Sequence, residues 1–222
     1  MLFALGRPIA FAGLLAAFLL ALTLRALAIR FVARRLHMAD GPITPSPRED
    51  VDPFGAVAAA VGGAGWGKTI DVDEVPRGFG RGRTAWLYLA GPLVTLVVAQ
   101  PMFFLYALIN PSSYQLAFYR VSDVLRGQVE DSGFEQFVLA LAVGLLAFGL
   151  LALIPVPPLD GFGLLWIAQR RPGPGMQGYR LWFEQKNLGV VLLLVCCFFP
   201  LSSPFLMIPL DLVGTPFLRL WS

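Results

Sequence analysis

Asp160 is the clearest residue in this chain that combines a reactive side chain with an apolar setting. It closes the sequence LALIPVPPLD, directly after an apolar stretch and a run of prolines. An ionisable group inside or at the edge of a membrane is costly and usually has a partner, so Asp160 is a candidate functional residue. The alternative is structural, because the carboxylate can cap a short helix that begins near Gly161.

The other reactive side chains predict no further site. The one histidine, His37, follows two arginines at a predicted helix end, where a solvated or capping role is expected. Cys196 and Cys197 are adjacent and point about 100° apart on a helix, which favours core packing over a shared metal ion. A serine hydrolase needs a base beside its serine, and no such base is found on a segment facing Ser112, Ser202 or Ser203. The sequence therefore predicts no catalytic residue, no metal ion and no cofactor.

The composition requires a lipid environment around these residues. Of the 222 residues, 57% are hydrophobic and 14% are charged, and the mean hydropathy is +0.70. These values exclude disorder and an ordinary water-soluble domain. The net charge of +3 comes from arginines between apolar runs, which is a topology signal and not a nucleic-acid-binding face. The sequence therefore predicts an all-α integral membrane protein, with the bilayer as its first partner.

Four apolar stretches are long enough to cross a membrane within a single polytopic domain, 1–222. They are 8–33, 85–109, 136–154 and 187–210. The first is expected to be a retained helix and not a secretory signal, because its arginines follow the apolar run. The last contains Pro200, Pro204 and Pro209 and is expected to be kinked or broken.

The distribution of lysine and arginine predicts the orientation. The segment 30–83 carries eight of them and 170–186 carries four, against three on the opposite side. The positive-inside rule then places both richer segments, including the loop 34–84, in the cytoplasm and the amino terminus outside the cell membrane. Within that loop, 54–67 is apolar, rich in small residues and too short to span, so we expect a re-entrant or interfacial segment packed against the first and third spans.

Four sequence blocks, in this order, resemble motifs of one family. They are Asp52-Pro53-Phe54-Gly55, Gly65-Trp66-Gly67-Lys68, Ala90-Gly91-Pro92-Leu93 and Pro155-Val156-Pro157-Pro158-Leu159-Asp160-Gly161. The set is similar to the site-2 protease family, the intramembrane zinc metalloproteases, and in particular to its short bacterial branch without a PDZ domain. The resemblance covers roughly residues 20 to 170 and implies a site-2 protease-like core.

The chain departs from the family where the zinc would bind. The family uses a His-Glu-x-x-His helix, in which residues i and i+4 ligate zinc and the glutamate acts as general base. The matching residues here are Arg25-Ala26-Leu27-Ala28-Ile29. Arg25 and Ile29 stand at the ligand positions and Ala26 at the base, and none of these side chains can do that chemistry. Thr95 and Ala152 also replace asparagines that the family usually has, and Asp160 alone remains, at the position of the third ligand.

The resemblance and the departures together favour a catalytically inactive homologue. We expect a scaffold, accessory subunit or assembly factor that binds other transmembrane proteins in a membrane complex. Two alternatives remain: a metalloprotease whose site is completed by another chain, and a small transporter or channel component that uses Asp160 and Arg25.

One structural prediction follows from the family geometry. The groups at positions 25 and 160 meet on one zinc in the family, so Arg25 and Asp160 are expected to form an ion pair here, which relieves the desolvation of a lone carboxylate. The alternative is that Arg25 extends to the headgroups while Asp160 caps its helix.

Overall fold

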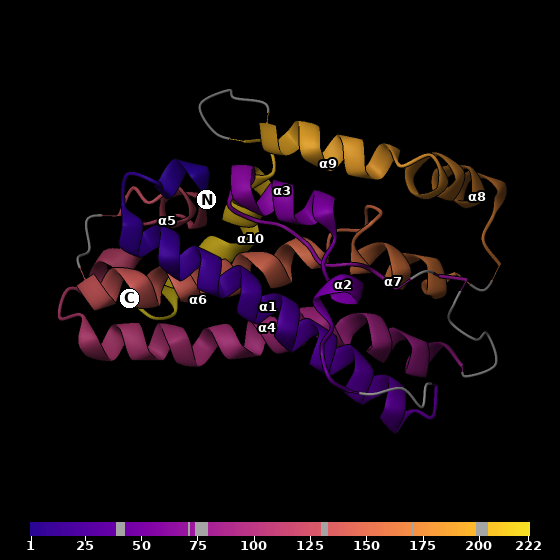
Figure 1. Ribbon diagram of the computed structural model, residues 1–222, viewed down its shortest axis with the longest axis horizontal. Coiled ribbons are helices and arrows are strands. Elements are labelled where there is room, and N and C mark those ends of the chain that lie inside the picture. The colour runs from indigo at the N-terminus through magenta and orange to yellow at the C-terminus, as the bar shows by residue number, and fades with distance from the viewer. Residues whose placement is uncertain (39–42, 71, 74–79, 130–132, 170, 199–203) are drawn as a thin grey trace.

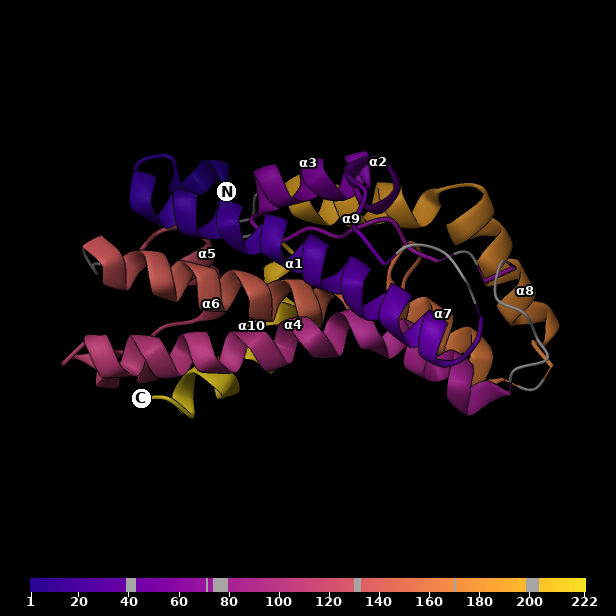
Figure 2. The same ribbon diagram turned by 60° about the horizontal axis from the view of Figure 1, so that its bottom comes forward.

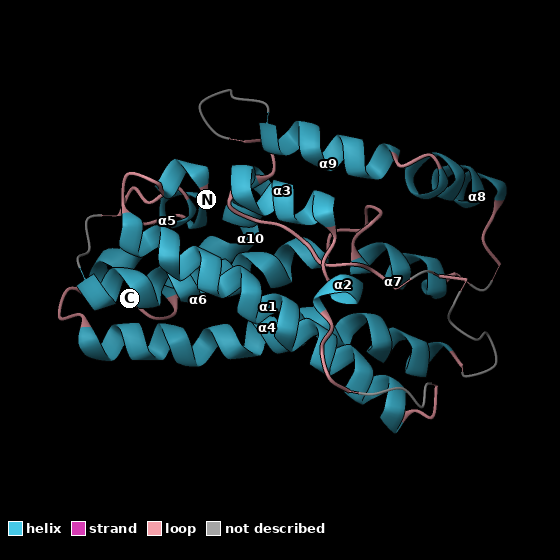
Figure 3. Ribbon diagram, viewed as in Figure 1, coloured by secondary structure: helices cyan, strands magenta, loops and turns pink. Residues whose placement is uncertain are grey.

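The chain is described from a computed structural model that covers all residues except 39–42, 71, 74–79, 130–132, 170 and 199–203. The described residues are helices and loops (Figure 3), with no β-strand and one isolated bridge between Val51 and Gly67. The predicted all-α membrane fold class is confirmed, since three helices are long and apolar enough to cross a membrane, or four if one bent pair is a span.

Three long helices form the centre of the molecule. They are α1 (Pro8–Arg35), α4 (Arg81–Ile109) and α6 (Gly133–Ala152). Figure 2 shows α6 between the other two, and 72% of its most apolar window is buried, against 39% for α1 and 28% for α4. Close approach depends on small side chains: a Cβ on Gly13 would lie 2.7 Å from the Phe137 carbonyl oxygen.

The fourth predicted span, 187–210, is divided between two helices. α9 covers Leu188–Phe198 and α10 covers Met207–Arg219, while 199–203 lie outside the described residues. α9 is preceded by α8 (Pro174–Arg180) and the π-helical turn η4 (Leu181–Gln185), and these two segments are bent from α9 by 65°. A continuous fourth crossing therefore stays a prediction.

The remaining short helices lie at the ends of the long ones. η1 (Leu2–Ala4), η3 (Ser113–Ala117) and α5 (Val121–Leu125) gather near the start of α1, with α10 packed against the latter two. α2 (Pro47–Asp50) and α7 (Asp160–Ala168) lie beside the second half of α1 (Figure 1).

The apolar segment 54–67 has two parts, which are helix α3 (Pro53–Gly62) and an extended stretch that leads to Lys68. α3 packs chiefly against α9 and η1, whereas packing against the first and third spans was expected. The reason is local, because Gly62 has no side chain and Cys197 of α9 fills the space: a Cβ there would lie 3.1 Å from the Cys197 Sγ.

The two arginine-rich segments meet at one end of the molecule. Arg180 of α8 forms an ion pair with Asp73 at 2.5 Å and another with Glu184 at 2.7 Å. Its hydrogen bond to Asp73 is the main cause that raises the pKa of the Arg180 guanidinium. The end of the segment 34–84 around Asp73 therefore meets α8, whereas α3 within the same segment reaches η1. The side of the membrane on which the Asp73 contact lies stays a prediction.

Candidate functional site

Arg25 and Asp160 form a buried, bidentate ion pair. The Arg25 Nε donates to Asp160 Oδ2 at 3.0 Å, and its Nη2 donates to Oδ1 at 2.6 Å. Their side chains are 5% and 1% exposed. Two parallel charge-assisted hydrogen bonds are the strongest geometry that these two groups can adopt. The structure therefore has the pair and not a guanidinium extended to the headgroups.

A backbone carbonyl completes the surroundings of the guanidinium. The Arg25 Nη1 donates to the Lys68 oxygen at 2.6 Å, so each of its three nitrogens donates to an oxygen. The arginine thereby joins α1, the extended stretch after α3, and α7. The Lys68 carbonyl could not be predicted from the sequence, because a backbone acceptor exists at every residue and only the fold decides which one is near.

A glycine makes room for the arginine. A Cβ on Gly91 of α4 would lie 2.6 Å from the Arg25 Cγ, whereas one on Gly67 would lie at an ordinary contact distance of 3.5 Å from its Nη1. Distances under 3.0 Å are essentially never seen for a real Cβ. Gly91 is therefore required where it stands, and the Ala-Gly-Pro block acquires a structural role as the wall against which Arg25 lies.

Asp160 owes its position to the turn before α7. It is the first residue of that helix. Gly161 packs where no side chain fits, since a Cβ there would lie 2.2 Å from the Leu153 carbonyl oxygen at the end of α6. Both Asp160 oxygens accept from Arg25, and no side chain makes a capping hydrogen bond at the start of α7. Of the two alternatives in the sequence, the described contacts therefore show the ion pair.

The first two motif blocks are bonded to each other. Asp52 caps α3 by accepting from the Phe54 amide at 3.0 Å, and its other oxygen accepts from the Trp66 Nε1 at 2.6 Å. Gly55 lies against the Trp66 backbone, where a Cβ would be 2.0 Å from the carbonyl oxygen. These contacts hold α3 against the extended stretch that follows it, and they place the Lys68 carbonyl oxygen within hydrogen-bond distance of Arg25.

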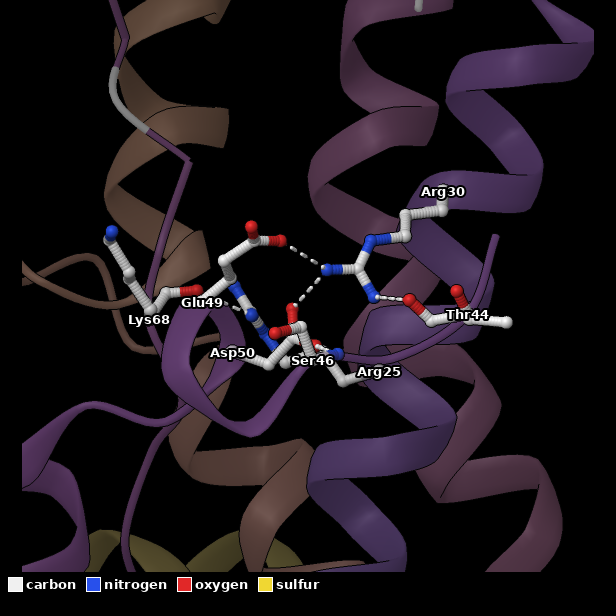
Figure 4. A network of polar contacts seen from close by, with 7 residues as sticks. All are labelled: Arg25, Arg30, Thr44, Ser46, Glu49, Asp50 and Lys68. Atoms are coloured by element: carbon white, nitrogen blue, oxygen red, sulfur yellow. Dashed lines mark hydrogen bonds and ion pairs between the residues drawn. The ribbon is translucent and has the colours of Figure 1, made fainter. Parts of the chain in front are cut away.

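A second arginine cluster lies one turn farther along α1. Arg30 bonds to Asp50 at 2.9 Å, to Glu49 at 3.3 Å and to the Thr44 carbonyl oxygen at 2.8 Å (Figure 4). Asp50 also accepts from the Ser46 amide at 2.7 Å. This cluster is more exposed than the first and holds α2 against α1. Sequence reasoning counted Arg30 only as a topology charge and missed this contact.

The other family-motif positions carry packing groups. Ala26 is buried, and Ile29 packs against a small cluster around Tyr88. Thr95 is fully buried and its hydroxyl donates to the Pro92 carbonyl oxygen of its own helix at 2.8 Å. Ala152 is buried at the end of α6. His37 is exposed beyond the end of α1, with a φ of 56°.

The residues present do not fit the zinc ion that the family resemblance implies. Both Asp160 oxygens already accept from a cation, and a guanidinium donates and cannot ligate a metal. Among the described residues, no group of three histidine, cysteine or acidic side chains is arranged to hold an ion. No catalytic step through zinc can be derived from these side chains.

The described residues form an all-α membrane protein in which Arg25 and Asp160 join α1 to α7. A comparison with known proteins agrees: the chain is 28% identical over 185 residues to "Putative zinc metalloprotease YwhC" of Bacillus subtilis (strain 168), which covers 82% of this chain and 76% of that protein. No family model and no solved structure matches the chain. The identity supports a site-2 protease-like relationship for this membrane protein.

Proposed function

We propose that this chain is a catalytically inactive site-2 protease-like protein that serves as a scaffold, accessory subunit or assembly factor for other transmembrane proteins. It would lie in the cell membrane as a multi-pass protein with its amino terminus outside. The observation that carries the proposal is the Arg25–Asp160 pair, in which a guanidinium occupies the place between α1 and α7 where the family positions a metal.

The pair supports an inactive role through its hydrogen bonding. A buried arginine beside a carboxylate stabilises the frame only if its charge is matched and its nitrogens have acceptors. Here the charge is matched by Asp160 and each of the three guanidinium nitrogens donates to an oxygen. A composite protease would require Asp160 to release Arg25 and accept a metal ligated by another chain. That exchange breaks two buried charge-assisted hydrogen bonds and leaves a buried cation behind, which is strongly unfavourable.

The outer faces of the long helices support a partnership with other membrane helices. Large apolar side chains on α4 point outward, and each is at least half exposed: Trp86, Val97, Phe104 and Leu108. In a membrane these surfaces contact lipid or neighbouring helices. The proposal requires that some of them contact a partner chain.

The first experiment measures metal and hydrolysis on the purified chain. We expect much less than one zinc per chain by elemental mass spectrometry after exchange into zinc-containing buffer, and no cleavage of a reporter transmembrane helix in proteoliposomes. Asp160→Asn is the matched variant, and it should leave both readings unchanged. Stoichiometric zinc, or cleavage that the variant abolishes, would overturn the inactive assignment.

The second experiment tests the scaffold. The tagged chain is extracted from its own membranes in mild detergent, and the proteins that purify with it are quantified. We expect a defined transmembrane partner near one copy per chain. Arg25→Met should reduce its recovery, whereas Arg30→Met, the same change on the same helix, should have a much smaller effect. The extraction is repeated after the membranes have been chemically cross-linked, which retains weakly bound partners. Recovery of the chain alone from these cross-linked membranes would contradict the scaffold role.

A further inference from the structure

Two pairs of arginines lie at the end of the molecule where α1 ends and α4 begins. Arg34 and Arg35 belong to the last turn of α1, and Arg81 and Arg83 belong to the first turn of α4. All four residues are exposed. Among the described residues, none of their guanidinium groups makes a hydrogen bond or an ion pair. The site and the proposed function described above do not use them.

The two pairs are neighbours because α1 and α4 run antiparallel here. Ala33, near the end of α1, packs in one small cluster with Leu87 and Tyr88 from the first turns of α4. Figure 1 and Figure 2 both show the end of α1 beside the beginning of α4. Four positive charges are therefore concentrated at one end of the molecule, on two adjacent helices.

Other arginines of this protein hold elements of the fold in place. Arg25 and Arg30, earlier on α1, are each bonded to acidic side chains. Asp73, in the loop before α4, is bonded to Arg180 of α8. At the opposite end of the two helices, Arg7 donates to a backbone carbonyl and α4 has no basic residue in its last turn. The two exposed pairs differ, because they hold no described element in place.

An exposed aromatic side chain lies one helical turn inside each pair. Phe31 precedes Arg34 and Arg35 by three and four residues. Trp86 follows Arg83 by three residues, so each ring shares a helix face with an arginine. Phe31 is 53% exposed and Trp86 is 58% exposed. The Arg35 guanidinium carbon lies 5.8 Å from the centre of the Phe31 ring, in a cation–π arrangement. Both helices thus have the layers of a membrane boundary, with aromatic rings first and cations beyond them.

The lengths of the two helices place the arginines at the depth of the headgroups. α1 has 28 residues and α4 has 29. At the rise of an α-helix each is about 42 Å long, against about 30 Å for the hydrocarbon core of a bilayer. Because α1 is apolar directly from Pro8 onward, its excess length lies at the end that carries Arg34 and Arg35.

We infer that this end of the molecule binds the anionic phospholipid headgroups of the membrane leaflet that it reaches. Each arginine near an anionic membrane surface adds to the attraction, and guanidinium groups grip phosphate oxygens through two hydrogen bonds. A soluble anion shares this charge but offers no apolar surroundings to Phe31 and Trp86. A lipid provides both, which is why a lipid is the source chosen.

The test places the full chain in bilayers that contain brominated lipids, which quench the fluorescence of nearby tryptophans. Brominated phosphatidylglycerol is compared with brominated phosphatidylcholine, which has the phosphate but no net charge. Subtracting the signal of Trp86→Phe isolates the quenching at Trp86 from that of the other four tryptophans. We expect phosphatidylglycerol to associate with this position on the order of fivefold more strongly at low salt, and most of that preference to disappear in about 1 M salt.

Charge variants then identify the residues responsible. Arg34→Gln/Arg35→Gln and Arg81→Gln/Arg83→Gln each remove two charges and should each lower the preference, while the combined variant should abolish it. Replacing the same four arginines by lysine keeps the charge and should keep most of the preference. Because the four guanidinium groups are exposed and make no hydrogen bond among the described residues, the midpoint of unfolding should not change. The salt titration uses the unmodified chain, so it decides the question even if a variant is destabilised.

Arg120→Gln/Arg219→Gln is the matched control. It also removes two exposed arginines, one beside α5 and one at the end of α10, and it should retain the preference. Equal quenching of Trp86 by the two lipids would overturn the inference. So would a preference that survives in the combined glutamine variant, one that does not respond to salt, or one that the control lowers as much as either pair does.

Discussion

Arg25→Met tests whether the buried ion pair holds the frame together. Methionine fills a similar volume with apolar atoms and removes every donor to Asp160 and to the Lys68 carbonyl oxygen. The Asp160 side chain, 1% exposed, would then be an uncompensated buried charge.

The expected cost follows from that burial. Breaking a buried pair by removing one partner costs about 3–5 kcal/mol of unfolding free energy. Replacing both partners by apolar groups is often neutral, so Arg25→Met/Asp160→Leu should recover most of the loss. The non-additivity between the single and double variants, measured as a double-mutant cycle, should exceed about 2 kcal/mol.

The assay is reversible unfolding in mixed micelles with increasing SDS, followed by far-UV circular dichroism. Arg30→Met is the control, because its ion pairs are more exposed than that of Arg25: the Arg30 side chain is 22% exposed, and those of its partners Asp50 and Glu49 are 18% and 73% exposed. Its loss should cost about 1 kcal/mol or less. Arg25→Met with a cost no larger than the control, or single variants whose costs simply add, would refute the reasoning.

Two smaller perturbations test the surroundings of Arg25. Gly91→Ala places a Cβ 2.6 Å from the Arg25 Cγ and should destabilise the protein by about 1–3 kcal/mol in the same SDS unfolding measurement. Gly82→Ala is the control on the same helix: its Cβ meets nothing within 4 Å, so it should be neutral or stabilising. Trp66→Phe removes the donor to Asp52 and should lower the free energy of unfolding by about 1–3 kcal/mol. Near-UV circular dichroism should report the loosened packing around Trp66. An unchanged SDS unfolding midpoint for Gly91→Ala or for Trp66→Phe would contradict the contact assigned to that residue.

The long helices could be anticipated because bilayer thickness sets their length. The stretches 8–33, 85–109 and 136–154 correspond to helices Pro8–Arg35, Arg81–Ile109 and Gly133–Ala152. Hydropathy recognises such helices without knowledge of their neighbours. The stretch 187–210 was harder, since its prolines indicate a break but not where each half packs.

The site could be anticipated only in part. Family geometry pointed to Arg25 and Asp160, because two positions that share a metal must lie close together. Contacts made by the backbone, such as the Lys68 carbonyl oxygen, leave no mark in the sequence. The same holds for the Arg180–Asp73 pair, whose members are 107 residues apart and meet only once two loops have been placed.

The blocks that resemble the family motifs and the positions that depart from them differ in what their residues do physically. Gly55, Gly91 and Gly161 are each needed because a Cβ would collide with a neighbouring atom, and Asp52 is needed as a cap. None of these roles involves a metal. The frame can therefore persist without zinc, provided that the space between α1 and α7 holds a group that neutralises Asp160. Arg25 neutralises Asp160 through two hydrogen bonds and makes a third to the Lys68 carbonyl oxygen. Replacing Arg25 by a metal-ligating side chain would therefore remove the contact that joins α1, α7 and the stretch after α3.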